Sequence, residues 1–329
     1  MKQIVFLLIP LFCLNCSSPS ETPIDPGTNN ATKPNIVLVI ADDMGKDATP
    51  NFSEGSVKPN MPTLQSLMDS GITFNNLWSY PVCTPTRASI LTGKYAVNTG
   101  VLEVGDLIST SETSLQSYIN SNNDYATAII GKWHLSNSAT DPITMGIDYF
   151  AGIVNGGVAD YFNWNFNENG IPLNSTTYTT TKLTDTAIDW VADQTKPWFL
   201  WMAYNAPHTP FHLAPTDLHS QGNLPTDEAS INANPIPYYM SAIEAMDTEL
   251  GRFLNSLSSE DRANTVIIFI GDNGTPGKVA QNPYSRLKVK GSLYQGGVNV
   301  PMIVSGRDVN RLGEREDALI HTTDLFATI

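Results

Sequence analysis

Short apolar runs alternate with helix-like segments along this chain, and this alternation restricts the fold more than any other feature. Residues 35–40 form an apolar run, which is typical of a strand that is buried on both faces. The same reasoning predicts strands at residues 126–130, 198–204, 265–270 and 301–304, and helices at residues 62–70, 83–91, 113–120, 183–192 and 238–257. This order is typical of an α/β fold in which helices sandwich a mostly parallel central sheet.

Two long stretches interrupt the alternation. Residues 151–181 are rich in Gly, Asn and Thr and contain four closely spaced aromatic residues, and residues 211–237 are polar and contain prolines. We expect both to form long loops or hairpins over the edge of the sheet, where insertions often determine specificity. The aromatic cluster suits a locally packed hairpin and the wall of a ligand site equally well.

The chain is strongly acidic. It has 329 residues and a net charge of −14, and its length suits one large domain or a domain and a half. Such acidity argues against nucleic acid and anionic membrane surfaces as partners. An anionic substrate would therefore need a local basic pocket on an acidic protein.

The N-terminal residues resemble an export signal. One lysine precedes an apolar run that is too short to span a bilayer, and Leu14-Asn15-Cys16 is similar to a bacterial lipoprotein site. We expect residues 1–16 to be a lipoprotein-type signal peptide that leaves Cys16 as the acylated N-terminus, and residues 17–33 to be a flexible tether. The expected location is the bacterial periplasm or outer membrane, with membrane contact only through the lipid; ordinary secretion is the alternative.

Acidic and amide side chains directly follow two of the predicted strands. Asp42 and Asp43 follow residues 35–40, and Asp272 and Asn273 follow residues 265–270. Ligand sites in open α/β sheets lie outside the carboxyl ends of the strands. Oxygen ligands alone favour Ca²⁺ or Mg²⁺. Each pair alone would suit a helix cap or a turn, but together they predict a cation site.

Cys83 is the single cysteine outside the N-terminal export segment. It opens the run Cys83-Thr84-Pro85-Thr86-Arg87, and an unpaired cysteine is unusual in an exported protein. If a helix begins at Cys83, Arg87 lies on the same face one turn later. The first turn of such a helix favours an anion.

Further basic residues follow other predicted strands or lie near a glycine-rich turn. Lys132 and His134 follow residues 126–130, His208 follows residues 198–204, and Lys290 precedes Gly291. Alone, each lysine could be a solvated side chain and each histidine a buried core residue. Together with Arg87 they predict a compact positive pocket around one cation, which would meet the need of an anionic substrate.

These motifs, in this order, resemble the type I sulfatase family. The most specific matches are the Cys83–Lys94 run, Gly131-Lys132-Trp133-His134 and Ala206-Pro207-His208-Thr209-Pro210-Phe211. The resemblance implies an alkaline-phosphatase-like α/β core over residues 34–329. The smaller C-terminal subdomain of the family is missing, and the last helix-like stretch stops after one turn, so we expect a truncated catalytic domain.

The resemblance also implies the cofactors and the roles of the site residues. Cys83 would be oxidised to formylglycine (3-oxoalanine) by a formylglycine-generating enzyme and would complete the shell of a calcium ion. Magnesium is the alternative ion. The other metal ligands would be Asp42, Asp43, Asp272 and Asn273, and the sulfate pocket would be lined by Arg87, Lys132, His134, His208 and Lys290.

The implied reaction is the hydrolysis of a sulfate ester. The cation and Arg87 would activate one hydroxyl of the formylglycine hydrate for attack on sulfur, while Lys132, Lys290 and His208 would hold the sulfate oxygens. His208, with Lys290, would protonate the leaving alcohol, and His134 would deprotonate the second hydroxyl to expel sulfate.

The expected substrate is a sulfated carbohydrate or an aryl sulfate. A phosphate or phosphonate ester hydrolase with a similar tetrahedral pocket is the first alternative. A non-catalytic glycan-binding lipoprotein on a degenerate hydrolase core is the second, because the aromatic stretch near residue 161 suits a sugar.

Overall fold

The computed structural model describes residues 33–329. The predicted signal peptide, Cys16 and all of the predicted tether except Lys33 lie outside the described residues. Among the helices of residues 33–329, none has the length and apolar character needed to cross a membrane.

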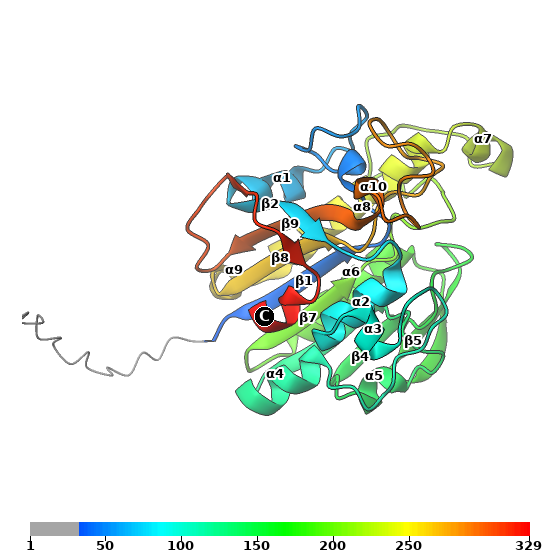
Figure 1. Ribbon diagram of the computed structural model, residues 1–329. Helices are drawn as coiled ribbons and strands as arrows, with labels where there is room; N and C mark the ends of the chain where they lie inside the picture. The colour runs from blue at the N-terminus through cyan, green and yellow to red at the C-terminus, as the bar shows by residue number, and fades with distance from the viewer. Residues whose placement is uncertain (1–32) are drawn as a thin grey trace, which may run out of the picture. The chain divides into compact units, whose positions relative to one another are not determined.

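The middle of the sheet is β1 (Asn35–Ala41), in which every residue is buried. The other strands are β2 (Gly71–Trp78), β3 (Ala126–Lys132), β4 (Tyr149–Ile153), β5 (Trp164–Glu168), β6 (Ile171–Ser175), β7 (Trp198–Ala203), β8 (Thr265–Gly271), β9 (Asn299–Gly306), β10 (Glu314–Glu316) and β11 (Ile320–His321). They form one sheet in the order β10-β2-β9-β8-β1-β7-β3-β4-β5-β6, and β11 also pairs with β2. The sheet is shown in Figure 1.

Strands β8, β1, β7, β3 and β4 are neighbours and all run parallel. Strand β9 is antiparallel to both β8 and β2, and β5 is antiparallel to β4 and β6. The prediction of a mostly parallel sheet is therefore confirmed. The carboxyl ends of four consecutive strands lie at one edge because those strands share a direction.

Helices cover both faces of this sheet (Figure 1). Val37 and Val39 point to one face and pack with α1 (Pro62–Asp69), α6 (Thr179–Ala192) and α8 (Ile236–Ser256). Leu38 and Ile40 point to the other face and pack with α2 (Cys83–Thr92), α4 (Leu115–Asn123) and α11 (Asp324–Thr328). The shorter helices are η1 (Lys46–Ala48), α3 (Ala96–Thr99), α5 (Asp141–Thr144), α7 (Glu228–Ala233), α9 (Ser259–Ala263) and α10 (Gln295–Val298).

Strands β2, β4, β10 and β11 and most of the short helices were not predicted, and helix α6 begins at a different residue. Strand β2 was not predicted, because Asn75 and Asn76 interrupt its apolar pattern where the pairing register with β9 shifts. Helix α6 begins four residues earlier than expected, since its first turn is made of threonines, which have low helix propensity. The stretch 151–181 contains the predicted hairpin, formed by β5 and β6, and the loop 211–237 includes α7.

Candidate active site

The sheet brings the predicted site residues to one edge. Asp272 and Asn273 follow β8, Asp42 and Asp43 follow β1, and His208 lies beyond the end of β7. Lys132 is the last residue of β3 and His134 follows it, so the motifs occupy four consecutive strand ends. This placement confirms the convergence that the sequence predicted.

The acidic residues at this edge are fully buried. Asp42, Asp272 and Asn273 have no exposed surface, and Asp43 is 1% exposed. The backbone N–H of Asp43 donates to Oδ1 of Asp272 at 3.1 Å, and Nδ2 of Asn273 donates to Oδ1 of Asp43 at 2.7 Å. These bonds hold the ends of β1 and β8 together.

The donor set fits a hard divalent cation. Among the described residues, Oδ1 of Asp42 and Oδ1 of Asn273 are buried oxygens that accept no hydrogen bond. Ligand atoms of Asp42, Cys83 and Asp272 lie within 4.8 Å of one another, and so do those of Asp42, Asp43 and His208. Buried oxygens without donors are costly unless a cation satisfies them, and oxygen ligands favour Ca²⁺ or Mg²⁺.

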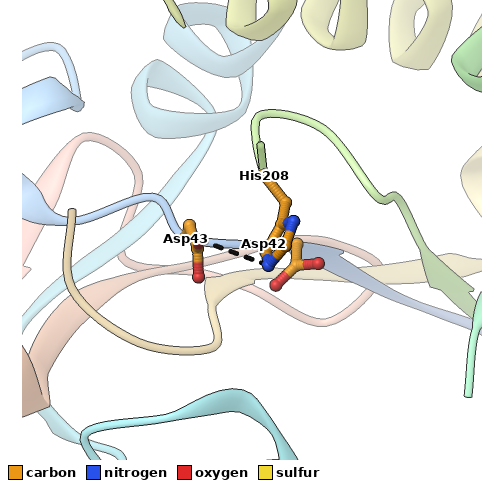
Figure 2. A group of neighbouring side chains, drawn as sticks. All are labelled: Asp42, Asp43 and His208. Atoms are coloured by element: carbon orange, nitrogen blue, oxygen red, sulfur yellow. Dashed lines mark ion pairs between the residues drawn. The ribbon is translucent and has the colours of Figure 1, made fainter. Parts of the chain in front are cut away.

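His208 faces Asp42 and Asp43 from the loop after β7 (Figure 2). Its Nε2 lies 3.8 Å from Oδ2 of Asp43, and its Nδ1 donates to the carbonyl of Thr209 at 2.7 Å. The Nδ1 hydrogen bond leaves Nε2 as the nitrogen that points into the site. The side chain of His208 is 20% exposed, so it lies at the entrance of the site.

Cys83 occupies the first position of α2, and every residue of that helix is buried. Its Sγ lies 3.1 Å from Nδ1 of His134 and 3.6 Å from Nζ of Lys132. Burial raises the pKa of the Cys83 thiol, although Lys132 opposes this shift. The structure therefore places the Cys83 side chain at a helix N-terminus, beside the imidazole of His134, the ammonium group of Lys132 and the buried carboxylates.

The arginine and the two lysines of the predicted basic set each pair with one carboxylate. Arg87 contacts Oδ2 of Asp272 at 2.7 Å. Nζ of Lys132 lies 2.5 Å from Oδ2 of Asp42. Nζ of Lys290 lies 2.6 Å from Oδ2 of Asp43. Although burial lowers the pKa of Lys290, the carboxylates of Asp43 and Asp42 hold it above its ordinary value.

The charges at this edge are interleaved, which differs in detail from the compact positive pocket expected from the sequence. Three cationic side chains match three carboxylates, so the cluster is neutral while both histidines are uncharged. Burial, reinforced by Lys132 and Arg87, lowers the pKa of His134 to about 3, which keeps this imidazole neutral. A bound divalent cation would add two positive charges, and the site would then attract an anion.

Tyr161, which belongs to the closely spaced aromatic residues, and Gly156, which the sequence did not single out, support the histidines. Oη of Tyr161 lies 2.8 and 2.7 Å from the carbonyl oxygens of Asn205 and His208, which share its single proton. A Cβ on Gly156 would lie 2.7 Å from Nε2 of His134. Only the lack of a side chain allows this loop to approach the histidine. These are contacts between distant segments, which no short motif reveals.

Comparison with known proteins agrees with this geometry. A family model described as Sulfatase matches residues 34–329. An uncharacterized sulfatase, YdeN, from Escherichia coli (strain K12) is 30% identical, and the alignment covers 95% of this chain and 64% of that protein. Arylsulfatase J of Mus musculus is 26% identical, with coverage of 93% and 53%. The chain thus spans less than two thirds of the length of these two relatives.

A solved structure shares the fold. The crystal structure of Ps i-CgsB in complex with k-i-k-neocarrahexaose superimposes with a TM-score of 0.79 at 27% sequence identity. The match covers 90% of this chain and 71% of that chain. The sheet therefore belongs to an architecture that is known from experiment.

Proposed function

Because the chain belongs to the sulfatase family, we propose that it hydrolyses sulfate esters. The observation that carries the proposal is the position of Cys83. It begins a buried helix, 3.1 Å from His134 and 3.6 Å from Lys132, next to a set of buried carboxylates. This arrangement supports a nucleophile at position 83, with His134 as its base, Lys132 as an anion-binding group and the carboxylates as metal ligands.

We further propose that Cys83 is converted to formylglycine by a formylglycine-generating enzyme. Three features support this: the Cys-Thr-Pro-Thr-Arg run, the absence of a disulfide partner among the described residues, and the buried position at the start of α2. The hydrated aldehyde would supply two hydroxyl groups, one for attack on sulfur and one for release of sulfate, and the cation would polarise the sulfate oxygens.

The chain's own residues would bind the ester and move the protons. Nδ1 of His134 is the ring atom nearest to position 83, so it would accept a proton from a hydroxyl there. Lys132 and Lys290 would turn from their carboxylates toward the sulfate oxygens when a cation occupies the acidic set. His208 lies at the entrance with Nε2 pointing inward, and its imidazolium form would protonate the leaving alcohol from that nitrogen.

The proposed substrate class is sulfated carbohydrate. Ps i-CgsB, which shares the fold at 27% identity, was solved with k-i-k-neocarrahexaose bound, and this supports an oligosaccharide in the corresponding region. The side chain of His208 is partly exposed, so the leaving-group side of the site is accessible. A small aryl sulfate would reach the same residues and serves as a generic probe.

The test combines chemistry at position 83 with turnover. The protein is produced with and without a formylglycine-generating enzyme, and a peptide spanning Cys83 is analysed by mass spectrometry. We expect an aldehyde and hydrolysis of p-nitrophenyl sulfate only after co-expression. Cys83→Ser, in a host that converts only cysteine, should be inactive or retain sulfate covalently. Faster turnover of p-nitrophenyl phosphate than of the sulfate, or wild-type activity of Cys83→Ser, would contradict the proposal.

A further inference from the structure

A polar cavity of about 300 Å³ lies beside the catalytic edge. It is lined by the loop after β4 and by the β5–β6 hairpin. None of the described residues that line it carries a charge, and five of them are asparagines: Asn155, Asn163, Asn165, Asn167 and Asn174.

The alternation of the hairpin strand produces this array of amides. In β5, Trp164 and Phe166 are buried in the core, whereas Asn165 is exposed and Asn167 is partly buried. Residues two positions apart lie on the same face of a strand, so Asn163, Asn165 and Asn167 share the face opposite the aromatic residues. The next strand places Asn174 directly opposite Asn165.

Most of these amides keep their hydrogen-bonding capacity. Nδ2 of Asn174 donates to Oδ1 of Asn163 at 3.0 Å. The side chains of Asn155, Asn165 and Asn167 make no hydrogen bond to other residues in the described part of the chain. A cavity with several free amides can therefore exchange water for a ligand that both donates and accepts hydrogen bonds.

The loop that lines the cavity also touches both catalytic histidines. Asn155 and Gly157 line the cavity, and Gly156 lies between them. A Cβ on Gly156 would approach Nε2 of His134 to 2.7 Å, and a Cβ on Gly157 would lie 3.3 Å from the ring of His208. The cavity is therefore one residue away from the groups that handle the sulfate ester.

We propose that this cavity binds a neutral sugar residue that adjoins the sulfated position of the substrate. The inference rests on the proposed function and specifies its substrate. Side-chain amides match sugar hydroxyls because both groups donate and accept hydrogen bonds. A sulfate or carboxylate in the cavity would meet no cationic lining residue, and an unpaired charge is costly to desolvate. The site thus favours an uncharged neighbour over a charged one.

The test compares two substrate sets on the matured enzyme. One set is lactose monosulfated at each galactose hydroxyl in turn, and the other is galactosyl-glucuronic acid sulfated in the same way. Wild type should hydrolyse at least one lactose sulfate with a kcat/KM about tenfold above that of the matching glucuronate. The double variant Asn165→Ala/Asn167→Ala should lower kcat/KM for that lactose sulfate by about tenfold, the loss expected for two ordinary hydrogen bonds, and leave p-nitrophenyl sulfate turnover unchanged.

Two further variants make the result decisive. Asn167→Lys introduces a cation into the cavity and should shift the preference toward the glucuronate set. Asn255→Ala, on an exposed position near the C-terminal end of α8, is the matched control and should leave both sets unchanged. If p-nitrophenyl sulfate is still hydrolysed but lactose sulfates are not preferred, or the double variant has no effect on them, the sugar-site inference is wrong and the proposed function stands. Absence of sulfatase turnover overturns the proposed function, and the inference falls with it.

Discussion

At the scale of single residues, His212 shows how the loop beyond β7 is held. Its ring stacks on Tyr161 with the centroids 3.9 Å apart, and its Nδ1 donates to the carbonyl of Pro210 at 2.9 Å. Its Nε2 lies 3.0 Å from Oη of Tyr178 and accepts the hydroxyl proton. Both ring nitrogens are satisfied in the neutral form, and Tyr161 in turn binds the carbonyl of His208.

This arrangement predicts a loss of stability in acid. Burial lowers the pKa of His212 to about 4, although its bond to Pro210 and the charge of Asp160 oppose the shift. Because the folded-state pKa lies below the unfolded value of about 6.5, the contribution is complete above pH 6.5 and is lost as the pH falls toward 4. Because His212 is partly accessible to solvent, its contribution to the free energy of unfolding is limited to the order of 2 kcal/mol.

The measurement is urea unfolding of wild type and His212→Gln at pH 7 and pH 4.5. The free energy of unfolding should fall less in the variant over this interval, by on the order of 2 kcal/mol. Carboxylates that titrate in the same range are common to both proteins and cancel in the comparison. Equal decreases in both proteins would show that His212 is not the acid-sensitive group.

At the scale of elements, helix α8 anchors the long loop 211–237 through Glu244. This side chain is 2% exposed. Its Oε2 accepts from the backbone N–H and the hydroxyl of Ser220, and its Oε1 accepts from Nε2 of Gln221 and the backbone N–H of Asn60. Hydrogen bonds to a carboxylate are stronger than neutral ones, so one residue of the helix fixes two loops.

Glu244→Ala should therefore lower the free energy of unfolding by about 3 kcal/mol, since buried donors are left without an acceptor. Limited proteolysis should also cut the loop 211–237 faster than in wild type. Asp185→Ala is the control, because Asp185 forms an exposed ion pair with Arg252 and such pairs contribute about 0.5 kcal/mol. Similar losses in the two variants would argue against an anchoring role of Glu244.

The elements also show what a sequence can and cannot predict. The apolar run of β1 requires burial on both faces, so the strand and the acidic pair after it were predictable. Strand β2 was not predicted because Asn75 and Asn76 break its apolar pattern. They lie where the register shifts, and pairing with β9 overrides the local sequence preference there. The contact of Gly156 with His134 was equally hidden. It depends on how two loops meet, whereas short motifs report only local chemistry.

At the scale of the whole molecule, the candidate active site joins residues that lie far apart in the described chain. Asp43 and Asp272 are 229 positions apart, and Cys83 comes from a helix between them in sequence. A cation that contacts all three would tie β1, α2 and β8 together, so its binding energy would count toward global stability. The pairing of the carboxylates with Arg87 and Lys132 limits their mutual repulsion, so we expect the metal-free protein to stay folded.

Chelation should therefore lower the melting temperature of the whole chain without unfolding it at room temperature. Calcium at about 100 times its Kd contributes about 2.7 kcal/mol, which corresponds to about 5 °C for a protein of this size. The shift between EDTA and calcium should shrink in Asn273→Ala, because that substitution removes a ligand oxygen while it leaves every charge in place. Asp217→Asn, at an exposed position outside the cluster, should keep the full shift. An equal shift of the melting temperature in all three proteins would show that the cation binds elsewhere. No shift in wild type would contradict a cation site at the buried, unpaired oxygens of Asp42 and Asn273.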